Sequence, residues 1–127
     1  MFTPRQDSET VIHEIVGDVC EGFLIEQEQD ANEVGVFYIF TNNHRLRGFV
    51  DAWLLFLSEY EGKSLPEEAL AERRFVPLEE RYPIRGVKVT KAEFRDATLT
   101  IRFGECVEVV IQCTDDDRSL IEIQPLN

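Results

Sequence analysis

The chain has 127 residues, of which 43% are hydrophobic and 30% are charged, and its formal net charge is −12. This balance excludes a disordered chain and fits one globular domain, so we expect a single domain over residues 1–127. The longest apolar run, 52–57, is too short to cross a bilayer, and the N-terminus carries no export signal. We therefore expect a cytoplasmic protein with no membrane partner.

Acidic residues are concentrated in the first third of the chain. No Lys or Arg lies between Arg5 and Arg45, whereas 12 basic and 16 acidic residues are nearly balanced from Arg45 onward. Such a field repels phosphate backbones, so we expect no nucleic-acid partner, and it attracts a basic protein. The alternative is a solvated surface that serves only solubility. We call this segment the acidic third; its acids are Asp7, Glu9, Glu14, Asp18, Glu21, Glu26, Glu28, Asp30 and Glu33.

The N-terminal part of the chain predicts antiparallel strands. Alternating apolar residues indicate strands at 10–16 and 19–27, joined by a tight hairpin at the Gly-Asp pair between them. Segment 34–40 is apolar on both faces, which predicts a strand covered from both sides. A turn at 42–44 then leads into a further strand at 45–50.

The middle of the chain predicts one or two helices. Segment 51–61 carries large residues at helical spacing and ends at a glycine; these residues are Trp53, Leu54, Leu57 and Tyr60. The apolar run 53–57 would also fit a buried strand. A second, short helix is indicated by the capping-box pair Ser64 and Glu67.

The C-terminal third predicts an antiparallel meander whose register depends on one loop. A two-residue loop would place Glu108 opposite Ile101 on the buried face. A three-residue loop that begins at Gly104 instead pairs Phe103 with Val107 and keeps the apolar residues on one side. We therefore predict the three-residue loop, with its glycine in a left-handed conformation.

These elements predict an α+β fold. Antiparallel β-meanders lie at both ends of the chain, and one or two helices in the middle pack on a sheet face. A two-layer sandwich and a partly rolled barrel both satisfy this pattern.

No motif in the sequence predicts catalysis, a cofactor or a metal. The three cysteines lack CxxC spacing, which indicates reduced thiols; they are Cys20, Cys106 and Cys113, the last on the apolar side of its strand. His13 and His44 show no metal-ligand spacing, and the acids at 115–117 lack the pattern of a calcium loop. We expect no catalytic residue, no cofactor and no metal.

Aromatic residues gather between positions 37 and 60. A small domain needs such side chains for its core, and the alternative is a partner-binding groove, because aromatic anchors dominate interface hot spots. The residues of this cluster are Phe37, Tyr38, Phe40, Phe49, Trp53, Phe56 and Tyr60.

We hypothesise a small acidic cytoplasmic protein-binding module, of immunity or inhibitor type, that neutralises a basic protein by occluding it. Acids would steer the partner and aromatic residues would anchor it; the candidate residues are Glu21, Glu26, Glu28, Asp30, Trp53 and Tyr60. One alternative is a non-catalytic structural or oligomeric accessory domain, monomeric or homodimeric, that pairs through a sheet edge or a helix face. The other is a small-ligand binder or an enzyme whose site is assembled from scattered residues.

Overall fold

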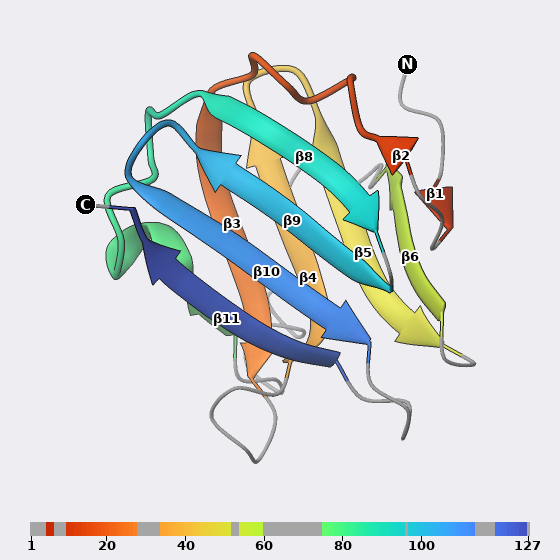
Figure 1. Ribbon diagram of the computed structural model, residues 1–127. Coiled ribbons are helices and arrows are strands. Elements are labelled where there is room, and N and C mark those ends of the chain that lie inside the picture. The colour runs from red at the N-terminus through yellow and green to blue at the C-terminus, as the bar shows by residue number, and fades with distance from the viewer. Residues whose placement is uncertain are drawn as a thin grey trace.

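The computed structural model describes residues 5–6, 10–27, 34–51, 54–59, 75–95, 97–113 and 119–126. These residues form two antiparallel sheets that lie over one another as two layers (Figure 1). In Figure 1, β8 to β11 form the near layer and cross in front of β3, β4 and β5.

The first sheet has six strands in the order β1-β6-β5-β4-β3-β7. Its strands β3 to β6 are consecutive in the chain, so each pairs with the next. Their bounds are β1 Arg5–Gln6, β3 Cys20–Gln27, β4 Val34–Thr41, β5 Arg45–Asp51, β6 Leu54–Glu59 and β7 Phe75–Pro77.

The second sheet has five strands in the order β11-β10-β9-β8-β2. The N-terminal strand β2 joins it at the edge beside β8, where Thr10 lies opposite Phe94. The bounds are β2 Thr10–Val11, β8 Val89–Arg95, β9 Thr98–Phe103, β10 Val107–Cys113 and β11 Ser119–Pro125.

Buried aromatic rings hold the two layers together. Phe23 of β3 stacks on Phe37 of β4 with ring centroids 6.2 Å apart, and its edge meets Phe103 of β9 at 6.1 Å. All three rings are fully buried. Since burial of one such side chain is worth roughly 1.5–3 kcal/mol, this contact between the sheets is a major part of the core.

The two sheets also meet at a corner of the backbone, formed by residues 17–20. On one side this segment pairs with the start of β8, because the amide of Gly17 donates to Val89 O at 2.8 Å and that of Cys20 to Val87 O at 2.9 Å. On the other side the amide of Asn42, just past β4, donates to Val19 O at 3.0 Å. The segment therefore links the end of β4 in one sheet to β8 in the other.

The predicted α+β fold is wrong, because the structure is nearly all β. Within the described ranges the one helical element is a 3₁₀ turn at Leu78–Glu80, and no helix packs on a sheet face.

Segment 51–61, predicted as a helix, instead contains the end of β5 and strand β6, which form an antiparallel hairpin. There the Leu57 side chain is fully buried, whereas its neighbour Phe56 is half-buried beside Phe49 of β5. Strand pairing with β5 therefore overrides the helical spacing. The helix predicted from Ser64 and Glu67 lies outside the described residues.

The predicted N-terminal hairpin is also wrong. Residues 13–17 form turns, and β2 pairs with β8 instead of β3. Ile12 and Ile15 are both fully buried, and their spacing of three suits a turn that crosses from one sheet to the other. Gly17 allows this turn to end, since its φ is +94°.

The predicted register of the C-terminal meander is confirmed. Phe103 lies opposite Val107 and Ile101 opposite Val109 across a three-residue loop. Gly104 in this loop has φ +56°, as the left-handed position requires. Cys113 is buried on the apolar side of β10.

Replacement of Gly48 by Ala should destabilise the protein strongly. Gly48 lies opposite Phe37, whose ring occupies the space that a Cβ atom would need. Because the Phe37 ring is fully buried and cannot swing away, we expect a loss of about 1–3 kcal/mol or more in the free energy of unfolding. Gly22→Ala is the control, since a Cβ there would meet the movable end of the Glu79 side chain at 3.2 Å. Urea unfolding that shows equal losses for both variants would contradict this account.

Candidate functional site

The corner between the sheets holds a buried carboxylate with three side-chain partners. Asp18 is 6% exposed, and its Oδ2 accepts a hydrogen bond from Thr41 Oγ1 at 2.8 Å. The same oxygen lies 2.7 Å from His44 Nδ1, and Oδ1 accepts a bond from Asn43 Nδ2 at 3.0 Å. We call these four residues the Asp18 cluster.

The turn between β4 and β5 presents these partners because of its local sequence. The Thr41 hydroxyl accepts the backbone amides of Asn43 at 3.3 Å and His44 at 2.9 Å, which closes the turn from within. The side chain of Asn42 reaches the other way and accepts the amide of Val19 at 2.9 Å. The turn is thus attached to the corner segment through both backbone and side chains.

The cluster keeps Asp18 charged. Burial by itself raises the pKa of this carboxyl, but the hydrogen bonds from Asn43, His44 and Thr41, with the charge of His44, outweigh burial and lower the pKa below its ordinary value of 3.8. A buried carboxylate with this many donors stabilises the fold, whereas an unpartnered one would destabilise it.

The His44–Asp18 pair has the geometry of an oriented base, but the hydroxyl beside it is not placed as a nucleophile. In acyl-transfer enzymes the nucleophile donates its hydrogen to the histidine, and the carboxylate orients that histidine from the other side. Here the Thr41 hydroxyl donates to Asp18 directly. The cluster therefore fixes a turn and does not form such a triad.

An open depression of about 400 Å³ lies over this turn. Glu21 at the start of β3 and Glu59 at the end of β6 line it, together with Arg45 at the start of β5; all three residues are exposed. Consecutive antiparallel strands bring these ends to the same border of the sheet. We call this feature the acidic depression; its residues are Glu21, Thr41, Asn42, Asn43, His44, Arg45 and Glu59.

Two of the six predicted partner-binding residues lie in the described part of the chain, and the structure does not bring them together. Glu21 lines the acidic depression, whereas Glu26 is half-buried near the other end of β3, where its Oε1 accepts the amide of Val36 at 3.3 Å. The other four, Glu28, Asp30, Trp53 and Tyr60, lie outside the described residues.

Sequence reasoning missed most of this site. It identified Asn42 to His44 as turn residues, but no spacing connects them to Asp18, which is 26 residues from His44. Glu59 was assigned to a predicted helix and Arg45 to a strand without a role. The one available signal was the polar run from Thr41 to His44 directly after an apolar strand, and it predicts a turn without naming its partner.

The outer face of the six-stranded sheet carries aromatic rings and arginines. The Arg45 guanidinium lies 5.3 Å from the Phe40 ring centroid, and that of Arg47 lies 4.9 Å from the Phe49 centroid. Both rings are half-buried. Of the predicted aromatic cluster, Phe37 belongs to the core, while Phe40 and Phe49 form cation–π contacts on this outer face.

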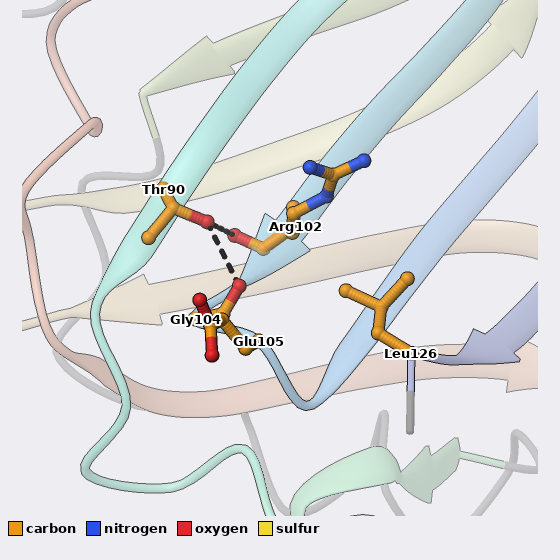
Figure 2. A pocket seen from close by; sticks show the side chains of 5 residues that line it. All are labelled: Thr90, Arg102, Gly104, Glu105 and Leu126. Carbon is orange, nitrogen blue, oxygen red and sulfur yellow. Dashed lines mark hydrogen bonds between the residues drawn. The ribbon is translucent and has the colours of Figure 1, made fainter.

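A second open depression, of about 470 Å³, lies on the five-stranded sheet and carries little chemistry. Figure 2 shows the Thr90 hydroxyl between two backbone oxygens, those of Gly104 at 3.1 Å and Arg102 at 3.4 Å. The Arg102 guanidinium is bound to Glu108, with N–O distances of 2.7 and 2.9 Å. Leu126 completes the lining and is 38% exposed.

The three cysteines are free thiols. Burial, followed by the nearby carboxylate of Glu79, raises the pKa of Cys20 to about 12, so this thiol is a poor nucleophile.

Comparison with protein-family models, with curated proteins and with solved structures found no significant match. In the part of the chain that the structure describes, no helix has both the length and the apolar character needed to cross a membrane.

Replacement of Asp18 by Asn should weaken the fold and change its response to acid. The folded pKa lies below 3.8, so the stabilisation by Asp18 is complete above that pH and is lost as the pH falls through the folded pKa. We expect Asp18→Asn to cost about 1–3 kcal/mol at neutral pH, because donors lose their charged acceptor.

Urea unfolding measured from pH 7 down to pH values around 2 tests this expectation. The difference between wild type and Asp18→Asn should shrink as Asp18 becomes protonated. Glu21→Gln, which neutralises an exposed neighbouring carboxylate, should stay within about 0.5 kcal/mol of wild type. A pH-independent difference between wild type and Asp18→Asn would refute the role given to this carboxylate.

Proposed function

We propose that this protein is a protein-binding module that receives a cationic side chain of a basic partner in the acidic depression. The partner is held by Glu21 and Glu59, and the bound module covers the partner's surface in the manner of an immunity or inhibitor protein. No bond is made or broken in the partner.

The observation that carries this proposal is the position of two exposed carboxylates on one rim. Glu21 and Glu59 come from β3 and β6, 38 residues apart in the chain, and both line the same depression. Carboxylates in this arrangement can accept charge-assisted hydrogen bonds from a guanidinium or an ammonium group.

The floor of the depression is already ordered before a partner arrives. The Asp18 cluster fixes Asn43 and His44, and the side chain of Asn42 is bonded to Val19. A preformed site loses less conformational entropy on binding than a loop that must order. This supports binding of a rigid partner surface.

The net charge of the protein also supports binding of a cationic partner. The net charge of −12 steers a cationic protein toward the molecule as a whole. Arg45 interrupts the acidic rim, and its guanidinium is held over the Phe40 ring. An incoming cation is therefore attracted to the Glu21 and Glu59 sides of the depression and repelled from the Arg45 side, which orients the partner.

We also propose a cytoplasmic location for this module. The three free cysteines support it, because reduced thiols persist in a reducing compartment.

Charge reversal at Glu59 should weaken binding of a basic peptide. The probe is acetyl-Arg-Arg-Arg-amide, titrated into the full-length protein by calorimetry at low salt. Loss of a charge-assisted contact should lower the association constant about tenfold for Glu59→Lys.

The matched control is Glu80→Lys, which makes the same change in net charge at an exposed residue of the 3₁₀ turn. It should lower the association constant only through the overall field, and 0.5 M salt should remove most of that effect. Equal losses in the two variants would show that net charge alone binds the peptide, and would overturn the site.

A further inference from the structure

Among the strands that the structure describes, β11 is a long edge without a second neighbour, whereas the other sheet edges are short. Among the described strands, the edges are β1 with two residues, β2 with two, β7 with three and β11 with seven. An edge of this length is a template for pairing with another strand unless charges or prolines protect it. In β11 the one charged residue is Glu122, and the one proline, Pro125, lies at its end.

The register identifies which backbone groups of β11 face outward. Cys113 and Ala97 are directly opposite one another and bonded, so odd-numbered residues of β10 point their amides and carbonyls toward β9. On the other side of β10, the amide of Leu126 donates to the carbonyl of Cys106. The even-numbered residues of β10 and β11 therefore bond to each other. It follows that the amides of Ile121 and Ile123 point away from β10.

The side chains of β11 alternate between the two faces. Ile121 and Ile123 are half-buried and pack against the core. Glu122 and Gln124 are exposed on the opposite face, where Gln124 Nε2 donates to Glu122 Oε1 at 2.9 Å. A strand that extends this sheet must repeat this alternation of apolar and polar residues.

We propose that β11 pairs with β11 of a second copy of this chain, antiparallel and about a two-fold axis, so that the two five-stranded sheets become one continuous sheet. This proposal does not rest on the proposed function. The axis passes beside Ile121, which lies opposite Ile121 of the second copy, and Ile123 lies opposite Ser119 of the second copy.

This register satisfies the outward groups of the edge. The amides of Ile121 and Ile123 each find a carbonyl, and the two isoleucines extend the core layer across the axis. The register shifted by one pair would place Glu122 opposite Glu122 of the second copy, which like-charge repulsion disfavours. The chosen register places Leu120 opposite Glu122 instead.

The second copy is the occupant because it supplies the required strand by itself. It carries the same alternation and the same unpaired groups, and a two-fold axis makes them complementary. The net charge of −12 on each copy opposes association. Dimerisation should therefore strengthen as salt screens this repulsion.

Concentration-dependent amide exchange, measured by NMR on the full chain, tests the pairing residue by residue. In the dimer the amides of Ile121 and Ile123 become protected, whereas those of Leu120 and Glu122, already bonded to β10, change little. We expect this alternation to appear as the protein concentration rises, together with a dimer mass in sedimentation.

A pair of variants separates the backbone contact from side-chain packing. Ile123→Pro and Ile123→Ala both remove the isoleucine side chain, but only the proline removes the outward amide. We expect Ile123→Pro to lower the dimer association constant about tenfold relative to Ile123→Ala.

Three results would overturn the proposal. The first is a monomer at all concentrations with exposed Ile121 and Ile123 amides. The second is protection of these amides at every dilution with a monomer mass, because another part of the same chain would then cover the edge. The third is equal dimerisation of the Pro and Ala variants.

Discussion

The carboxylate of Asp18 attaches the corner between the two sheets to the turn that follows β4. It sits where residues 17–20 pass between the two sheets, and it takes its hydrogen bonds from the turn that follows β4. Without it, Thr41, Asn43 and His44 would lose the carboxylate to which all three side chains bond. Both the corner of the sandwich and the floor of the acidic depression therefore depend on one buried negative charge, which is stable because its donors surround it.

The carboxylates of the acidic third have different environments in the structure. The sequence does not distinguish them, but those that the structure describes differ in burial and in bonding partners. Asp18 is used inside the fold, and Glu26 accepts a backbone amide. Glu21 is exposed and lines the acidic depression together with Glu59, which lies outside the acidic third. Long-range attraction follows from net charge, whereas local recognition follows from which carboxylates share a rim.

Segment 51–61 explains why the fold class was predicted wrongly. Apolar residues at spacings of three and four satisfy a helix, but a run of adjacent apolar residues satisfies a strand equally well when both faces are covered. Phe56 packs beside Phe49, and Leu57 enters the core. Whether this segment forms a helix or a strand depends on its pairing with β5, and a local sequence pattern contains no information about that pairing. In contrast, the β9–β10 hairpin was predictable, because both of its strands and its glycine turn are adjacent in the chain.

Composition and near neighbours along the chain account for the net charge, the strand predicted at 34–40, the hairpin with its three-residue loop at Gly104, and the turn chemistry of Asn42 to His44. Contacts between distant parts of the chain bring Asp18 to this turn, place Glu21 and Glu59 around one depression, and leave β11 at an edge among the described strands. The two sets of properties differ in their range along the chain. Alternation and turn propensity act over a few residues, whereas the contact between positions 18 and 44 requires β3 to pair with β4 and closes a loop of 26 residues.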